Sequence, residues 1–243
     1  MRLYWCPKTR ALRALWMLEE LGQPCERVLI DIRNPAARSD PAFRAASPMG
    51  KVPALVDGAT RLWDSGAICA YLADQYPAAG LAPPVGHPDR GAWLQWLMYT
   101  NAVIEPAMAE KFSQSPVSTL AHGWGSYDQM IEVLRSGLAH GPWILEERFS
   151  AADVLLGTSC YFMRQFGILQ NEPVLFDYAD RCMARPALQR ALALDVLAQP
   201  VGNPHAVAAW YRVPDGRTCP QGAGTSCSDS TSAGCRSSSS LRW

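Results

Sequence analysis

The first 76 residues alternate between the hydrophobic spacing of strands and that of helices. Residues 2–5 alternate as a short strand, and residues 11–21 carry apolar side chains at helical spacing before Gly22 ends the run. Residues 26–31 predict a second strand. The side chains expected on the core-facing side of the helix are Leu12, Leu15, Trp16 and Leu18. The chain therefore begins as strand, helix, strand.

A hairpin and a second helix complete this first unit. Residues 54–56 and 60–63 are expected to pair as strands, because the Asp57-Gly58 dipeptide near the junction accepts the positive backbone angles of a tight turn. Residues 65–76 then predict a helix. A βαβ unit followed by a ββα unit has too few strands for a doubly wound sheet. Residues 1–76 therefore predict a thioredoxin-like α/β domain.

The second part of the chain predicts helices only. Residues 77–88 hold four prolines and two glycines with little apolar periodicity, so we interpret them as a linker between domains. Residues 89–212 then predict an all-helical domain, in which Pro106 bends a long first helix. Two late helices are expected over residues 173–184 and 186–197.

Ser150 and Asp153 form a capping pair at the start of another helix in this domain. The Ser150 side chain can accept from the Asp153 backbone amide, while the Asp153 carboxylate accepts from the Ser150 amide. Two otherwise unpaired donors are thus satisfied where the helix enters the core. Removing either side chain should cost about 1 kcal/mol.

Residues 213–243 differ in composition from the rest of the chain. Half of residues 225–240 are serine and almost none is large and apolar, so this tail cannot bury enough surface to offset the entropy of ordering. Its cysteines, Cys219, Cys227 and Cys235, lack the close spacing of zinc ligands. We expect a disordered tail rather than a metal or disulfide array.

Composition and charge exclude several function classes. Lysine plus arginine equals aspartate plus glutamate at 22 each, so no global field favours nucleic acid or an anionic membrane. No apolar run reaches the roughly 20 residues of a membrane span, and the first strand leaves no room for a targeting segment. Cys6, Cys25, Cys69, Cys160 and Cys182 are scattered without metal-ligand spacing. We expect a cytoplasmic protein with reduced thiols and no metal.

Residues suited to binding a ligand occur in two segments of the first domain. Residues 47–55 combine a turn, the lone Lys51, and Pro53 at the mouth of an apolar strand. Asp64 and Ser65 form an acidic-hydroxyl pair that opens an apolar helix, where free amides and the helix dipole attract a carboxylate. Together these segments predict a site for a small, extended, anionic, peptide-like ligand.

Five short motifs follow one another along the chain, namely LYWCPKTR (3–10) running into ALRALWMLEELG (11–22), GKVPAL (50–55), DS (64–65) and FSAAD (149–153). With these motifs in this order, the chain resembles the cytosolic glutathione S-transferase family, and in particular bacterial-type members with a serine- or threonine-like N-terminal loop. The resemblance covers about residues 1–200. It implies a thioredoxin-like N-terminal domain joined to an all-helical C-terminal domain, with glutathione as co-substrate and a small hydrophobic electrophile as acceptor.

The resemblance also assigns the two ends of glutathione to these segments. Val52-Pro53 resembles the family's cis-proline pair, whose turn exposes the Val52 backbone groups to the cysteinyl backbone, like an added strand. By resemblance, Ser65 holds the γ-glutamyl carboxylate, Asp64 faces the ammonium or fixes the turn, and Lys51 pairs with the glycyl carboxylate. The alternatives are an ordinary trans proline, simple N-capping and an unengaged surface lysine.

Activation of the glutathione thiol is left open between two residues. A free thiol of this type has a pKa near 8.5, so the protein must stabilise the thiolate. Thr9 falls where serine-type members of the family place their hydroxyl. Cys6 resembles the cysteine of redox-type members, and a helix N-terminus with Lys8 and Arg10 is expected to lower the pKa of its thiol. Tyr4, inside the first strand, is interpreted as a packed aromatic.

By resemblance alone, three residues of the second domain are expected at the electrophile pocket: Tyr99, Met108 and Trp210. Core packing is the alternative for each. The family is usually dimeric, so we expect a homodimer that binds small molecules and neither nucleic acid nor membrane. Two other functions stay open, namely a glutathione-dependent thiol-disulfide oxidoreductase that uses Cys6 and a noncatalytic module that binds partners.

Overall fold

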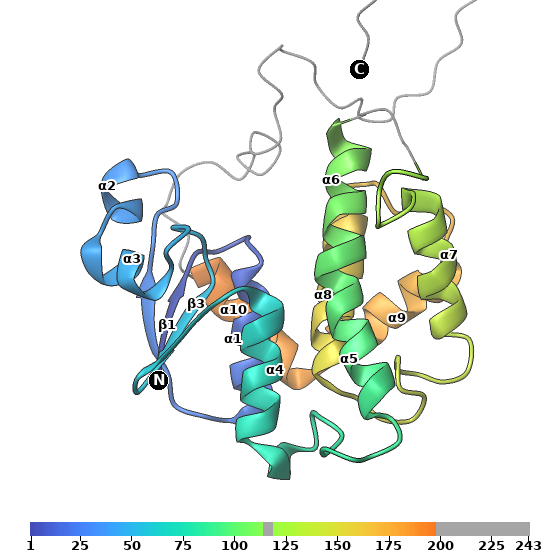
Figure 1. The fold of residues 1–243 in the computed structure, drawn as a ribbon, viewed down its shortest axis with the longest axis horizontal. Helices are drawn as coiled ribbons and strands as arrows, with labels where there is room; N and C mark the ends of the chain where they lie inside the picture. Colours follow the sequence, from blue (N-terminus) through green and yellow to red (C-terminus); the bar gives the residue numbers. More distant parts are fainter. Residues whose placement is uncertain (114–118, 198–243) are drawn as a thin grey trace, which may run out of the picture.

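The computed structural model describes residues 1–113 and 119–197, which form two lobes (Figure 1). The first lobe holds a four-stranded sheet in the order β2-β1-β3-β4. β1 pairs parallel with β2 and antiparallel with β3, which in turn pairs antiparallel with β4. This mixed sheet is the predicted thioredoxin-like arrangement. Its elements are β1 (Arg2–Trp5), α1 (Ala11–Leu21), β2 (Glu26–Leu29), α2 (Pro35–Arg38), α3 (Pro41–Ala46), β3 (Ala54–Asp57), β4 (Thr60–Trp63) and α4 (Ser65–Gln75).

Alternation of side chains along β1 builds a core on each face of the sheet. Leu3 and Trp5 join the large core that includes the buried faces of α1 and α4. Tyr4 points to the other face, where its ring packs against Phe43 of α3 at 5.5 Å between ring centroids. The helices α1 and α4 thus cover one face of the sheet and α3 covers the other (Figure 1).

Two predicted elements of the first lobe end earlier than expected. β2 stops at Leu29 rather than at residue 31, because Asp31 turns the chain by accepting the N–H of Arg33 at 3.0 Å. α4 stops at Gln75 rather than at residue 76. α1 has the predicted bounds, and Gly22 ends it in the left-handed conformation with φ 62°.

The short helices α2 and α3 were not predicted. Each begins with a polar residue followed by proline. Asn34 accepts the N–H of Ala36 at 2.9 Å, and Asp40 accepts the N–H of Phe43 at 2.8 Å. These caps compensate for helices that are too short to be stable through their own hydrogen bonds.

The second lobe is built from helices, as predicted for the chain beyond the linker. The predicted linker holds a single turn of 3-10 helix, and the predicted boundaries at residues 76 and 88 stay predictions. The elements are η1 (Pro77–Ala79), α5 (Arg90–Tyr99), η2 (Thr100–Ile104), α6 (Glu105–Ser113), α7 (Tyr127–Gly137), α8 (Ala151–Gln165), α9 (Pro173–Met183) and α10 (Pro186–Leu197).

α5, η2 and α6 follow one another as a single rod, in which η2 is a turn of π-helix (Figure 1). Pro106 lies just after this turn. It has no N–H to donate and its ring crowds the carbonyl four residues earlier, so the preceding turn is wider than an α-helix. A bend was predicted at Pro106, and the structure has instead this wider turn directly before it. The wide turn carries Asn101, and Glu105 follows it directly.

Ser150 and Asp153 form the predicted capping box at the start of α8. The Asp153 carboxylate accepts the Ser150 N–H at 2.9 Å, and it also accepts the Ile144 N–H and the Tyr178 hydroxyl, each at 2.9 Å. Burial raises the pKa of this carboxyl to about 6, even though these hydrogen bonds lower it. Asp153 therefore connects the start of α8 to Ile144 and to Tyr178 of α9, in addition to capping the helix.

The last described helix, α10, returns to the first lobe and lies along α1 (Figure 1). No helix in the described part of the chain is long and apolar enough to span a membrane. The cysteines of that part, which are Cys6, Cys25, Cys69, Cys160 and Cys182, are free thiols. Trp210 and the predicted tail, residues 213–243, lie outside the described residues.

Candidate functional site

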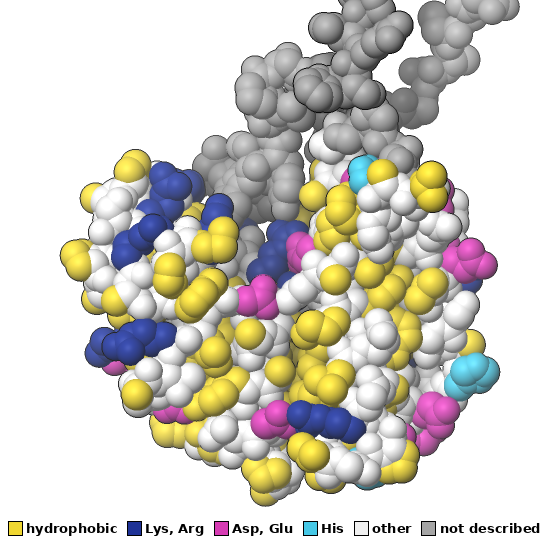
Figure 2. All heavy atoms as spheres, in the orientation of Figure 1, with side chains coloured by type: hydrophobic (Ala, Val, Ile, Leu, Met, Phe, Trp, Pro, Cys, Tyr) yellow, Lys and Arg dark blue, Asp and Glu magenta, His cyan; other side chains and the backbone are white. Residues whose placement is uncertain are grey.

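A cavity of about 520 Å³ opens between the two lobes, a size typical of small-molecule sites. The first lobe contributes the β1–α1 loop, the segment before β3 and the start of α4, and the second contributes η2, the start of α6 and the end of α8. Figure 2 shows basic and acidic side chains in the hollow between the lobes. Of the predicted site residues, the cavity is lined by Thr9, Lys51, Val52, Pro53, Asp64 and Ser65.

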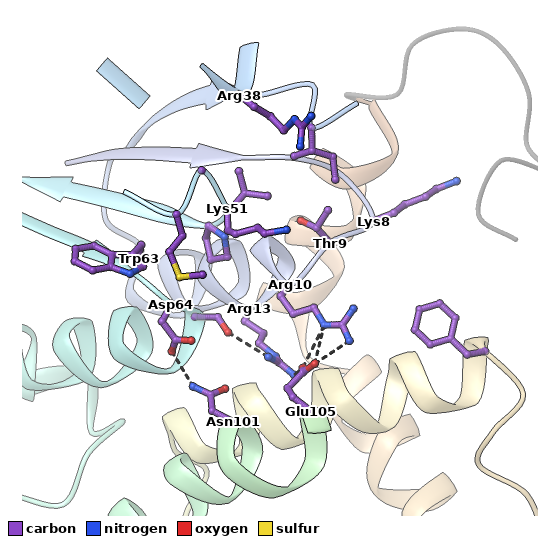
Figure 3. Close-up of a pocket in the computed structure, with 17 residues that line it drawn as sticks. Lys8, Thr9, Arg10, Arg13, Arg38, Lys51, Trp63, Asp64, Asn101 and Glu105 are labelled. Atoms are coloured by element: carbon purple, nitrogen blue, oxygen red, sulfur yellow. Dashed lines mark hydrogen bonds and ion pairs between the residues drawn. The ribbon is translucent and has the colours of Figure 1, made fainter. Parts of the chain in front are cut away.

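The segment before β3 lines the cavity with Lys51 and Val52. Figure 3 shows Lys51 among the residues drawn there. The Ser47 hydroxyl donates to the Lys51 carbonyl at 2.8 Å and accepts the Lys51 N–H at 3.0 Å, which holds the backbone just before the turn. The Val52-Pro53 peptide bond is cis, as the resemblance implied. No described residue forms an ion pair with Lys51 or a hydrogen bond with the Val52 backbone. Both are therefore available to a ligand.

Asp64 occupies a backbone conformation that residues with side chains rarely adopt, at φ 139°. Its carboxylate accepts the N–H groups of Gly66 at 2.8 Å and Ala67 at 3.1 Å, so it caps α4. Asn101 of the second lobe donates to the same carboxylate at 2.7 Å (Figure 3). Asp64 therefore fixes the turn before α4, the second of the two roles expected for it.

Ser65 is the first residue of α4 and is buried at the wall of the cavity. Its hydroxyl oxygen accepts from the Arg13 guanidinium at 3.1 Å, which leaves the hydroxyl proton to be donated elsewhere. Its N–H donates to no described residue. The helix terminus therefore offers two donors to an anion from one residue.

Arg13 and Glu105 join the lobes beneath this helix terminus (Figure 3). Arg13 is fully buried and donates to Glu105 at 2.7 Å, to Ser159 at 2.7 Å and to Ser65. Arg10 donates to Glu105 as well, at 2.9 Å. Burial by itself would raise the pKa of Glu105, but the charges of Arg13 and Arg10 hold it at about 2. Glu105 is therefore a carboxylate at neutral pH, and it orients Arg13 toward Ser65.

Thr9 lies at the start of α1, in the wall of the cavity. Its hydroxyl oxygen accepts the N–H of Ala11 at 3.1 Å, and the hydroxyl donates to the Cys6 carbonyl at 2.7 Å. Thr9 therefore lines the cavity, but its hydroxyl proton is directed at the backbone of its own loop.

Cys6 does not line the cavity, and its thiol is buried. Burial raises the pKa of this thiol more than the hydrogen bond from the Ile32 backbone lowers it. The expectation of a lowered pKa was wrong, because the effect of burial outweighs the groups that lower the pKa of this thiol. A thiol in this environment is a poor nucleophile at neutral pH.

Tyr99 and Met108 pack in the core of the second lobe rather than at the cavity. The Tyr99 hydroxyl donates to the Met130 carbonyl at 3.0 Å, and its ring meets Trp96 edge to face. The core-packing alternative therefore describes both residues. Phe166, just after α8, is the described aromatic of the second lobe that lines the cavity.

Four polar residues that line the cavity were not recognised as functional in the sequence, namely Arg13, Arg38, Asn101 and Glu105. Arg13 did carry a signal, since a charged residue inside an apolar helix run must find a partner if it is buried. The sequence could not identify that partner, because it lies 92 positions further along the chain. Asn101 and Glu105 carry no comparable signal.

Comparison with known proteins agrees with this geometry. Residues 3–83 match the family model described as the glutathione S-transferase N-terminal domain. The disulfide-bond oxidoreductase YfcG of Escherichia coli K12 is 27% identical over 208 residues, which cover 78% of this chain and 93% of YfcG. Glutathione S-transferase GstB of the same strain is 25% identical over 198 residues, which cover 77% of this chain and 95% of GstB.

A solved structure extends the match to both lobes. The glutathione S-transferase of a sphingomonad, complexed with glutathione, superposes with a TM-score of 0.68 and 31% sequence identity. The match covers 82% of this chain and 100% of the sphingomonad protein. The shared sequence, the sheet topology and the two-lobed fold lead to one conclusion: this chain belongs to the glutathione S-transferase family.

Proposed function

We propose that this chain binds glutathione in the cavity between the lobes and activates its thiol for transfer to a small electrophile. The observation that carries the proposal is the set of donors that the first lobe leaves uncommitted. Lys51 has no ion-pair partner among the described residues, the Val52 backbone makes no hydrogen bond with them, and Ser65 offers an N–H and a hydroxyl. A tripeptide with a carboxylate at each end and an extended backbone between them matches these donors.

The γ-glutamyl carboxylate would lie at Ser65, at the N-terminus of α4, and the glycyl carboxylate at Lys51. The central cysteinyl residue would then pair with the Val52 backbone, and its sulfur would face the start of α1. Replacing Ser65 by alanine removes a hydrogen bond to a charged group and should weaken glutathione binding by about 1 to 3 kcal/mol. Trp63 lines the cavity, so its fluorescence can report the titration. The exposed Ser136→Ala on α7 is the matched control.

Thr9 is proposed as the hydroxyl that stabilises the thiolate. To do so it must turn its proton from the Cys6 carbonyl to the sulfur while it still accepts the Ala11 N–H. The lost bond is worth about 1 kcal/mol, whereas a hydrogen bond to a charged group is worth about 1.5 to 3 kcal/mol. The exchange therefore favours the thiolate when glutathione is bound.

The experiment for this step compares Thr9→Ala, Thr9→Ser and Cys6→Ser in a conjugation assay and in a thiol-disulfide exchange assay. Thr9→Ala should lower kcat/KM roughly tenfold to a hundredfold and raise the pKa of the bound thiol, whereas Thr9→Ser should keep most of the activity. Cys6→Ser should stay close to wild type, since that thiol is buried. Full activity in Thr9→Ala would remove Thr9 from the mechanism.

Thiol-disulfide exchange is a second candidate function, and the similarity to the disulfide-bond oxidoreductase YfcG favours it. Because no described cysteine lines the cavity, the attacking sulfur would be that of glutathione. Its thiolate would form a new bond to one sulfur of a disulfide and release the other sulfur as a thiolate, which takes a proton from water. The reaction needs no further oxidant, and the exchange assay measures it directly.

A noncatalytic binding module is the remaining alternative. Retention on immobilised glutathione without activity in either assay would support it. The homodimer and the cytoplasmic location remain predictions, and size-exclusion chromatography with light scattering tests the dimer.

A further inference from the structure

The loop between β1 and α1 is tied to the far end of the described chain. Lys8 in this loop has φ 57°, the left-handed conformation that favours glycine. Its backbone N–H points at both carboxylate oxygens of Asp195 on α10, at 2.9 and 3.0 Å. The two residues lie 187 positions apart in the sequence. A strained residue next to Thr9 is thus held by a carboxylate from the second lobe.

Packing alone does not explain a carboxylate at this position. Asp195 is 7% exposed, and aspartate is rarely buried without a partner. Among residues 186–195 of α10, the other buried ones are Ala187, Leu188 and Ala191, which contribute to the core without any charge. The Lys8 N–H is the hydrogen-bond donor that Asp195 has among the described residues. The carboxylate therefore acts on the loop rather than on the helix packing.

The loop that Asp195 holds is the one that carries the proposed thiolate donor. Lys8 precedes Thr9, whose hydroxyl binds the backbone of Cys6 and Ala11 on either side. The turn at Lys8 therefore decides where the Thr9 hydroxyl and the first turn of α1 lie relative to the cavity.

We propose that Asp195 is a positioning residue, which holds the Lys8 turn so that Thr9 and the start of α1 face the bound thiol. This role rests on the proposed glutathione chemistry. Asp195 does not line the cavity, so in this proposal α10 acts on the site through the Lys8 turn.

The contact also makes the loop sensitive to pH. Burial raises the pKa of Asp195 to about 6, and the Lys8 N–H and ammonium oppose that rise. The hydrogen bond and the charge of Lys8 both lower the pKa of Asp195, which means that they favour its ionised form. The contact is therefore stronger when Asp195 is a carboxylate, and it weakens as the pH falls through about 6 and the carboxylate takes up a proton. The other described titratable groups affected by its charge are Cys6 in the loop and Tyr161 on α8, whose pKa values it raises further.

Hydrogen exchange of the Lys8 amide in the ligand-free full chain tests the contact. In the wild type, protection of this amide, corrected for the intrinsic pH dependence of exchange, should fall as the pH drops from 7 to 5. In Asp195→Asn it should be roughly tenfold lower at pH 7 and show no such step. The exposed Asp177→Asn on α9 is the control with the same charge change and should match the wild type. Equal protection in Asp195→Asn and wild type would overturn the contact.

Steady-state kinetics test the positioning role. Asp195→Asn should lower kcat roughly tenfold while KM for glutathione changes less than about twofold, and Asp195→Ala should lose more because it keeps no acceptor. The acid limb of the wild-type kcat profile near pH 6 should disappear in Asp195→Asn. A loss confined to thermal stability, with kcat and its pH profile unchanged, would overturn the positioning role. A wild-type protein inactive with glutathione would instead overturn the proposed function, while the exchange measurement would still decide the contact.

Discussion

The guanidinium of Arg13 meets the carboxylate of Glu105 at 2.7 Å across the boundary between the two lobes. Arg13 is buried, and its other hydrogen bonds reach Ser65 at the helix terminus proposed to bind a carboxylate and Ser159 on α8. One ion pair therefore links the packing of the lobes to the position of a ligand donor. Removing one partner of such a pair leaves the other charge uncompensated.

Arg13→Lys should destabilise the protein by roughly 2 to 4 kcal/mol, because an ammonium cannot replace the planar fork that contacts three residues at once. Glutathione binding should weaken as well, since Ser65 loses its anchor. Urea denaturation measures the first effect and fluorescence titration the second. The control is Arg190→Lys, since Arg190 is half exposed and pairs with Glu19. Equal losses of unfolding free energy and of glutathione affinity in the two variants would contradict the role of Arg13 in linking the lobes to Ser65.

Stability at acid pH should depend on Glu105. Its pKa in the folded protein is about 2, below the ordinary value of 4.5, so the stability it contributes is present above about pH 4.5 and is lost as the pH falls toward 2. Glu105→Gln should therefore lower stability at neutral pH by on the order of 2 to 3 kcal/mol and converge with the wild type near pH 2. Urea unfolding at a series of pH values measures the difference. A constant difference across this range would contradict the assigned cause.

The hydrogen bond from Asn101 to Asp64 should support ligand binding more than folding, because Asp64 is exposed in the described structure. Asn101→Ala should weaken glutathione binding by about 1 kcal/mol, or about fivefold in Kd. Gly66→Ala should act similarly, since its new Cβ would lie 2.5 Å from the Asn101 side-chain nitrogen. Gly91→Ala in α5 meets nothing within 4 Å and serves as the control. Unchanged affinity in both site variants would show that the Asp64 turn needs no support.

Asp153 should matter more to stability than a helix cap does. Asp153→Ala leaves the N–H groups of Ser150 and Ile144 and the Tyr178 hydroxyl without an acceptor, and each such loss costs about 1 to 3 kcal/mol. We expect a loss of roughly 3 kcal/mol or more in urea denaturation, against about 1 kcal/mol for Tyr178→Phe. A loss near 1 kcal/mol in Asp153→Ala would mean that capping is its only contribution.

Much of the fold was predictable because its signals are local. The helix over residues 11–21 follows from its apolar spacing and Gly22, and the β3–β4 hairpin follows from Asp57-Gly58. α2 and α3 carried capping signals at Asn34 and Asp40, but each helix is too short to show a hydrophobic period.

The site was predictable only in the first lobe, where neighbouring residues in the sequence line the cavity together. Lys51 and Ser65 were expected at a ligand site because each lies in a short motif that carries the family resemblance, and both line the cavity. Glu105 and Asn101 lie on the other lobe, and their roles arise from how the lobes dock. Tyr99 illustrates the reverse error, since an aromatic in an amphipathic helix has the same sequence signature whether it faces a core or a pocket.

Isothermal titration calorimetry of the full-length protein with reduced glutathione tests the central claim most directly. We predict saturable binding at a single site per chain, weakened in Ser65→Ala and unchanged in Ser136→Ala. Heats that never saturate, or equal affinity in the wild type and Ser65→Ala, would contradict a glutathione site at the start of α4.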